Sequence, residues 1–424
     1  MLNRSITPPF GKITSIDLIE PSVHHLDNGL PIFSVNAGTQ EVLKIELIFN
    51  AGTANADKKL VASASSKLQT EGTTKRTAMQ LAEAVDFFGA HLQSEVTHDE
   101  ATLSLYTLNK HVDNTIGTLA EVYSEPVFAA REVETYLLKS KQEMLVNEEK
   151  VSYLGAKAFS AALYGKDHPY GRSANQQDYD AVNRQDLVDF HSSLIQKRIK
   201  HILVSGKLSS TTIQSLNQHF GQEKRLAVSE NPILINAIEP MVHHVEKSGA
   251  VQNSIKIGRV LFNRTHSDFV GMQILSTVLG GYFGSRLMAN IREDKGYTYG
   301  IGAGLVSLQG SGYLSISTEV GADVCEAAVN EIFIEIERLR KEPIPIHELE
   351  IVQNYMLGTI LKSLDGPFHI SDKWKTYLRY GLGSDSHYGL IRQIQNMTPE
   401  RLRELANTYL QRKNLLQVTA GKPM

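Results

Sequence analysis

The residues of this chain best suited to chemistry are Arg292 and Tyr299, which lie close together in a glycine-containing stretch, Leu279–Tyr299. An arginine guanidinium offers a rigid, planar set of donors that suits carbonyl oxygens. A tyrosine hydroxyl can donate a hydrogen bond to the oxyanion that develops when a carbonyl carbon is attacked. The pair therefore predicts a surface that binds carbonyl groups and stabilises negative charge on them.

A purely structural interpretation of the same stretch is an alternative. The charged run Arg292–Lys295 would then be solvated at a helix end, and Tyr299 would pack on a strand. Gly280 and Gly281 predict a sharp turn, since glycine adopts positive φ without steric cost. A turn with no binding role suits these two glycines almost as well as a position beside a ligand.

The elements around this stretch repeat an arrangement found in the first half of the chain. A strand and a helix are followed by Glu125-Pro126, which opens a second helix, and the same order recurs before Glu342-Pro343. The two prolines are about half the chain length apart. Such an internal repeat indicates two copies of one folding unit.

Alternating or continuous runs of β-branched residues predict strands, and longer amphipathic runs predict helices. Asp27-Asn28-Gly29 predicts a tight hairpin turn. The strands expected are 32–35, 42–49, 101–108, 201–204, 254–262, 300–306, 313–319 and 416–420, and the helices include 78–88, 113–123, 132–148, 322–340 and 399–411. We expect an α+β protein with two homologous domains, each a mostly antiparallel or mixed sheet with helices packed on one face. The domains are 1–222 and 241–424, and the polar, proline-containing segment 223–240 is their linker.

Composition narrows the class of protein further. The 424 residues are 42% hydrophobic and 21% charged, with a formal net charge of -3, which does not suit a nucleic-acid-binding protein. No apolar run is long enough to cross a membrane. The N-terminal residues 1–19 show no secretory signal pattern, so we expect a cytoplasmic protein. The single cysteine, Cys325, permits no internal disulfide and is expected to be a small buried hydrophobe.

The two similar halves, the Asn28-Gly29 hairpin and the segment Ile291–Tyr299 together resemble the insulinase/pitrilysin family of inverted zinc peptidases. The resemblance covers nearly the whole chain and is strongest to the small members that work as two-chain assemblies, such as mitochondrial-processing-peptidase-like proteins. In that family a helix of the first domain carries H-x-x-E-H, whose histidines bind zinc and whose glutamate acts as general base. A distant glutamate is the third ligand.

This sequence departs from the family pattern at the zinc helix. With Gly72-Thr73 as a landmark, the H-x-x-E-H positions are occupied by Ala62, Ser65 and Ser66. The third-ligand position falls on Glu143, which is then vestigial, because one carboxylate alone cannot hold zinc with useful affinity. The resemblance thus implies that this chain has no metal or cofactor of its own and that zinc is supplied by a partner.

The second half keeps the family's substrate-binding pattern. Arg292 and Tyr299 match the residues that grip the substrate backbone and stabilise the oxyanion, and Gly280 and Gly281 match a turn near the substrate. The segment Gly89–Thr97 resembles the edge strand to which a substrate peptide adds.

The resemblance implies a non-zinc subunit that supplies Arg292 and Tyr299 to a zinc-bearing paralogous chain, and it leaves a homodimer open as the assembly. A peptide is the expected ligand, and neither nucleic acid nor a membrane is expected as a partner. An inactive scaffold or peptide-binding protein of the same fold is the alternative. A hydrolase that uses a serine among Ser63, Ser65 and Ser66 is a third hypothesis, for which the sequence offers no supporting motif.

Overall fold

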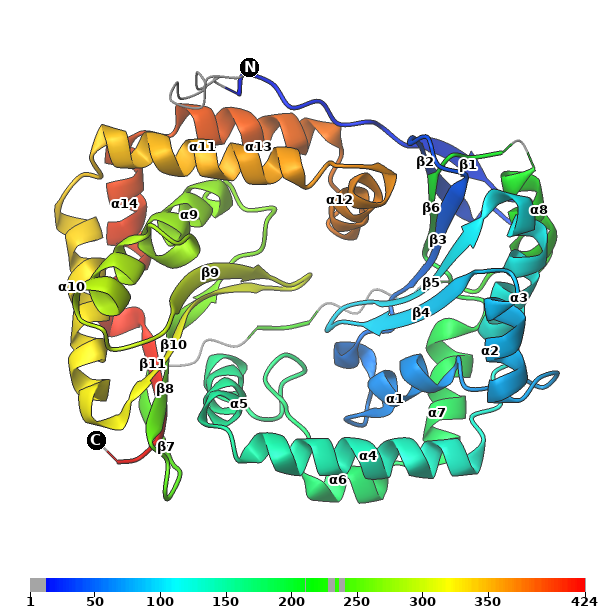
Figure 1. The fold of residues 1–424 in the computed structure, drawn as a ribbon, viewed down its shortest axis with the longest axis horizontal. Helices are drawn as coiled ribbons and strands as arrows, with labels where there is room; N and C mark the ends of the chain where they lie inside the picture. Colours follow the sequence, from blue (N-terminus) through cyan, green and yellow to red (C-terminus); the bar gives the residue numbers. More distant parts are fainter. Residues whose placement is uncertain (1–12, 210, 228–232, 236–240, 424) are drawn as a thin grey trace, which may run out of the picture.

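The computed structural model describes residues 13–209, 211–227, 233–235 and 241–423. In Figure 1 the two halves of the chain lie side by side, each built around its own sheet. Most of the predicted N-terminal segment and much of the predicted linker, residues 228–232 and 236–240, lie outside the described residues.

The first half forms a six-stranded sheet with the order β1-β2-β6-β3-β5-β4. Only β2 and β6 pair in parallel, and the other neighbours are antiparallel. The elements of this half are β1 (Ser22–His25), β2 (Pro31–Asn36), β3 (Val42–Phe49), α1 (Val61–Leu68), α2 (Ala78–Asp86), β4 (His91–Val96), β5 (Ala101–Leu108), α3 (Val112–Ser124), α4 (Ala130–Glu148), α5 (Val151–Tyr164), α6 (Gln176–Ala181), α7 (Arg184–Phe190), β6 (His201–Gly206) and α8 (Thr212–Phe220).

The second half forms a five-stranded sheet with the order β7-β11-β8-β10-β9, in which only β7 and β11 are parallel. Its elements are β7 (Val242–Glu246), β8 (Gln252–Leu261), α9 (Phe269–Ser276), β9 (Ile301–Ser307), β10 (Gly312–Gly321), α10 (Cys325–Lys341), α11 (Ile346–Lys362), α12 (Pro367–Arg379), α13 (Ser384–Asn396), α14 (Pro399–Tyr409) and β11 (Leu416–Gly421). This order matches β2-β6-β3-β5-β4 strand for strand. The predicted α+β fold and its internal repeat are confirmed.

Each sheet buries one face against helices of its own half. In the first half Leu43, Ile45 and Leu47 of β3 share a buried cluster with residues of α1 and α3. In the second half Ile255 and Ile257 of β8 share one with residues of α9 and α10. These side chains alternate along their strands, as the sequence pattern predicts for a face that meets a helical layer.

The opposite face of each sheet is covered by a helix from the other half. Phe159 of α5 packs with Leu416 and Val418 of β11, while Ile370 and Trp374 of α12 belong to a cluster that includes first-half strand residues. The two helices occupy equivalent places in the repeat, so the halves exchange them reciprocally. Amphipathicity predicts that a helix has a buried face but not which sheet receives it, so the sequence did not reveal this exchange.

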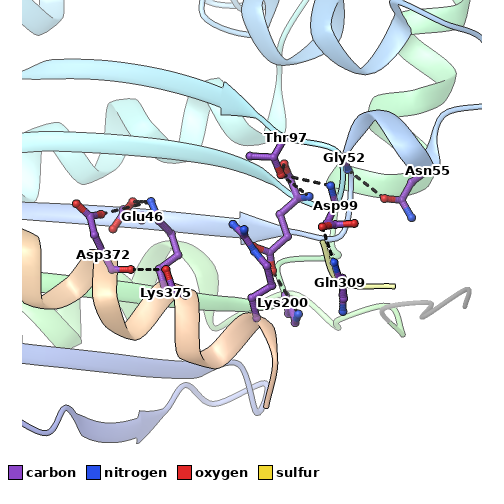
Figure 2. A network of polar contacts seen from close by, with 12 residues as sticks. Glu46, Gly52, Asn55, Thr97, Asp99, Lys200, Gln309, Asp372 and Lys375 are labelled. Carbon is purple, nitrogen blue, oxygen red and sulfur yellow. Dashed lines mark hydrogen bonds and ion pairs between the residues drawn. The ribbon is translucent and has the colours of Figure 1, made fainter. Parts of the chain in front are cut away.

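Buried charges fix α12 on the first sheet. Lys44 and Glu46 of β3 are only 4% and 1% exposed, and their side chains pair at 3.1 Å. Asp372 accepts from Lys44 at 2.8 Å, and Lys375 lies 2.8 Å from Glu46. Figure 2 shows Asp372 and Lys375 of the helix beside Glu46. The ion pairs raise the pKa of Lys44 against the opposing effect of its burial, so Lys44 stays charged.

The two equivalent hairpins also meet at their turns. Asp99, between β4 and β5, accepts from the backbone N–H of Gln309, between β9 and β10, at 2.8 Å, as Figure 2 shows. The Tyr170 hydroxyl donates to the same carboxylate at 2.6 Å and accepts from the Gly310 N–H at 3.2 Å. The hairpin tips and the exchanged helices together hold the two halves in one arrangement.

We expect Glu46→Gln to destabilise the protein by roughly 3 kcal/mol, because it removes the buried carboxylate that pairs with Lys44 and Lys375 and leaves them only the half-exposed Asp372. The measurement is the urea unfolding midpoint. The matched control is Glu41→Gln, which removes an exposed pair with Lys207 and should cost less than about 1 kcal/mol. Equal effects of the two substitutions would contradict this account of the interface.

Candidate substrate-binding site and the position of the lost zinc motif

Arg292 is held between two aromatic rings. It lies in a π-helical segment, Met288–Asp294. The buried residues of this segment, Met288 and Ile291, belong to the hydrophobic core of the second half. Its guanidinium carbon lies 4.7 Å from the centroid of the Phe283 ring and 5.5 Å from that of Tyr299. Such contacts position a guanidinium without using its N–H groups. No carboxylate among the described residues forms an ion pair with Arg292, so its donors remain available to a ligand.

Tyr299 points into solvent, with 92% of its surface exposed. The residue before it fixes the local backbone: the Thr298 hydroxyl donates to the Glu319 carbonyl at 2.7 Å, at the end of β10. The Gly300 N–H returns a hydrogen bond to the same hydroxyl at 3.1 Å. The structure thus brings Arg292 and Tyr299 together on one exposed surface, which the purely structural interpretation of a tyrosine packed on a strand does not describe.

Phe283 is a site residue that sequence reasoning missed. It is 66% exposed, and its only signal in the sequence is an apolar residue in a glycine-rich segment. A salt bridge from the following turn anchors this segment: Arg286 binds Glu348 of α11 through two hydrogen bonds of 2.8 and 2.7 Å. Ion pairing with Glu348 raises the pKa of Arg286, although burial, the largest effect on this group, acts in the opposite direction.

The glycine turn is built differently from the prediction. Gly280 and Gly281 end a π-helical segment, Thr277–Gly281, and neither is among the glycines with positive φ, so the predicted left-handed turn was wrong. Gly280 is required for close approach instead. A Cβ on it would lie 2.6 Å from the Ala303 backbone nitrogen on β9, whereas a Cβ on Gly281 would meet only the Thr277 side chain, at 3.2 Å.

The positions of the expected zinc motif lie on α1, which begins after Leu60, a residue with φ of 70°. Ala62, Ser65 and Ser66 are 2%, 2% and 7% exposed, and α1 packs against α4 and α7. Their methyl and hydroxymethyl side chains offer neither an imidazole nor a carboxylate, so these residues do not fit a zinc ion. Across the described ranges, no histidine or carboxylate hydrogen-bonds to Ser63, Ser65 or Ser66, as a serine nucleophile would require.

Glu143 lies on an exposed part of α4. It is close to two tyrosines, Tyr136 and Tyr179. Burial is the main cause of the raised pKa of each phenol, which is about 12 for Tyr179, and the Glu143 carboxylate makes a smaller contribution in the same direction. Within the described residues, no cluster of three or more histidine, cysteine, aspartate or glutamate side chains is arranged to hold a metal ion.

The segment Gly89–Thr97, which the sequence predicts to be an edge strand, contains the edge strand β4. β4 is the last strand of the first sheet and, within the described part of the chain, pairs only with β5. His91 and Glu95 on it are exposed, and the Gln93 side-chain amide donates to Glu95 at 2.7 Å. A free edge presents backbone donors and acceptors to which an extended peptide can add.

Comparison with models of protein families shows the family of this chain. The model described as "Insulinase (Peptidase family M16)" matches residues 32–175. The model described as "Peptidase M16 inactive domain" matches residues 181–356. Together the matched segments span well over half of the chain. This protein belongs to the insulinase (M16) peptidase family.

Individual relatives agree with this assignment. The M16 chain is 25% identical over 358 residues to an uncharacterized zinc protease of Mycobacterium tuberculosis, covering 81% of this chain and 80% of the relative. It is 23% identical over 212 residues to a probable inactive metalloprotease of Bacillus subtilis, covering 49% of each chain. A crystal structure of a peptidase M16 inactive domain from Pseudomonas fluorescens has the same fold, with a TM-score of 0.86 at 21% identity and coverage of 95% and 98%.

No helix in the described part of this M16 chain has the length and apolar character needed to cross a membrane.

We expect Gly280→Ala to destabilise the protein by about 1–3 kcal/mol, because the new methyl group overlaps the β9 backbone. The neighbouring substitution Gly281→Ala is the matched control and should have a smaller effect, since its methyl meets a single side chain. Thermal unfolding of both variants checks the difference. Equal stability of the two variants would show that close approach to Ala303 does not constrain Gly280.

Proposed function

We propose that this chain is the non-zinc subunit of a two-chain peptidase and contributes Arg292 and Tyr299 to peptide hydrolysis at a zinc ion held by a paralogous partner. The proposal rests on how Arg292 is held and on its lack of an ion-pair partner among the described residues. It is positioned by Phe283 and Tyr299 through ring contacts, while its N–H donors have no carboxylate partner in the part of the chain that the structure describes.

A guanidinium in this state is suited to substrate backbone carbonyls. Its fork of donors binds oxygen acceptors directionally, and the ring contacts reduce the freedom that binding would otherwise remove. Tyr299 places a second, neutral donor beside it. In the proposed assembly Arg292 orients the peptide and the Tyr299 hydroxyl donates to the oxyanion of the transition state.

The composition of α1 supports a division of labour between two chains. Ala62, Ser65 and Ser66 provide no zinc ligands where the family has its zinc helix, so a retained Arg292–Tyr299 pair is chemically useful if a partner chain supplies the metal. The exposed edge of β4 supports a peptide as the ligand. A heteromeric pair is the proposed assembly, and a homodimer would lack zinc on both sides.

A catalytically inactive, peptide-binding scaffold is the second candidate. It is favoured by the absence of ligating side chains on α1 and by the similarity to the Bacillus subtilis protein named as probably inactive. The Tyr299 hydroxyl beside Arg292 favours the first candidate, because a peptide-binding scaffold has no use for an oxyanion donor.

The decisive experiment mixes the purified chain with a zinc-bearing paralogue from the same organism. We expect the chain alone to hold no stoichiometric zinc and to cleave no peptide, and the mixture to cleave. Arg292→Ala or Tyr299→Phe in this chain should lower kcat/KM of the mixture roughly a hundred-fold, with the complex still formed by gel filtration.

A matched control is Arg403→Ala, which removes an exposed arginine on α14 and should leave cleavage unchanged. Cleavage by the mixture that is indifferent to both Arg292 and Tyr299 would refute the proposed role. A complex that forms without cleaving any peptide would favour the scaffold.

A further inference from the structure

A cavity of about 670 Å³ lies among α9, α11, α12 and α13, beside the glycine turn. Thr277 and Gly281 of the turn line it, together with Tyr355 of α11. Arg264, in the loop before α9, and Lys373, on α12, line it as well. The cavity therefore brings two cationic side chains from distant parts of the second half to one place.

Arg264 has no anionic partner in the described structure. Its guanidinium carbon lies 5.7 Å from the centroid of the Phe269 ring and 5.3 Å from that of Tyr380. Its Nε is buried, and no hydrogen-bond acceptor is found for it among the described residues. Burial lowers the pKa of this guanidinium.

Lys373 likewise lacks an anionic partner among the described residues. Its Nζ lies 5.2 Å from the centroid of the Tyr377 ring, and across the described ranges no carboxylate pairs with it. Burial and the charge of Arg264 lower its pKa to about 8. Its neighbours on α12 differ, since Asp372 and Lys375 both belong to the buried ion network on the first sheet.

Two like charges that face one partly buried cavity destabilise the folded state unless an anion lies between them. Asp385 is the one carboxylate on the cavity lining, and it is exposed to solvent. The charged side chains on the lining, Arg264, Lys373 and Asp385, leave one excess positive charge. A single negative charge matches this balance better than a dianion such as phosphate.

The glycine turn connects the cavity lining with the residues around Arg292, because Gly281 lines the cavity and Phe283 contacts Arg292. The Tyr282 ring contacts the Tyr355 ring, with centroids 5.3 Å apart, and the next residue, Phe283, is the ring that holds Arg292. The two sites thus lie on either side of one short segment, Gly281–Phe283, within reach of a single peptide in the arrangement proposed below. Apolar residues of the lining, among them Met356, Ile360 and Leu390, suit a peptide side chain or end more than a free inorganic ion.

We propose that this cavity binds a peptide carboxylate between Arg264 and Lys373, either the C-terminal carboxylate or an aspartate or glutamate side chain. The peptide part of the proposal rests on the proposed function, whereas the carboxylate specificity rests on the two unpaired cations alone. The cavity would then set which peptides are bound, and Arg292 where they are held.

The test is isothermal titration calorimetry of the full chain, without any partner, against three synthetic nine-residue peptides of one neutral sequence. The first has a free C-terminus, the second a C-terminal amide, and the third a C-terminal amide with one internal glutamate. We expect the amide without glutamate to bind at least about ten-fold more weakly than one of the other two. The stronger of those two identifies the source of the carboxylate.

Lys373→Met should remove that preference while leaving the melting temperature unchanged or higher, because it deletes an unpaired, partly buried charge. Lys362→Met, at the exposed end of α11 and off the cavity lining, is the matched control. Equal affinity for all three peptides, or a preference that survives Lys373→Met, would overturn the proposal. Binding of inorganic phosphate with no carboxylate preference among the peptides would overturn it too.

Failure of this proposal and failure of the proposed function give different results. The calorimetry needs no zinc-bearing partner, so loss of carboxylate preference leaves the reconstitution of cleavage untouched. Conversely, a chain that prefers carboxylate peptides but never supports cleavage would retain this cavity as the site of a peptide-binding protein.

Discussion

The buried charges on the face of β3 determine how the molecule is held together. Lys44 and Glu46 lie where a half-exposed strand would put polar side chains into water, yet both are covered by α12. Charges removed from water in this way are tolerated only with partners in place, and the partners come from residues more than three hundred positions away. The same helix carries Lys373 on another side, so one element both closes the interface and lines the cationic cavity.

The exposed surface that carries Arg292 and Tyr299 depends on that arrangement indirectly. Arg292 and Tyr299 are positioned by contacts within the second half: Phe283 at the turn, Thr298 at the end of β10, and the Arg286–Glu348 pair to α11. The edge strand β4, by contrast, belongs to the first half. The ion network and the hairpin contact through Asp99 keep these two surfaces in a fixed relation, which a peptide that touches both would require.

The sequence predicted the repeat, most strands but not β1 or β7, and about half of the helices, because hydrophobic periodicity reports local structure directly. It placed Ala62, Ser65 and Ser66 on a helix and Arg292 near Tyr299, both as the structure has them. It could not predict which sheet α5 and α12 cover, since a helix face carries no record of its partner. The reason predicted for Gly280 was wrong. The sequence alone cannot distinguish a glycine needed for positive φ from one needed because a Cβ would lie 2.6 Å from a neighbouring backbone atom. Phe283 and the unpaired state of Lys373 likewise emerge only from tertiary contacts.

The position of β11 has a consequence for how the protein is made. This strand, Leu416–Gly421, lies inside the second sheet between β7 and β8, and α5 of the first half packs on it. While the chain is being synthesised, α5 has therefore left the ribosome long before its docking surface exists. Its apolar side stays uncovered while more than two hundred further residues are translated. During this time a chaperone or an aggregating neighbour can bind it. The first half can therefore complete its packing only after β11 has been synthesised.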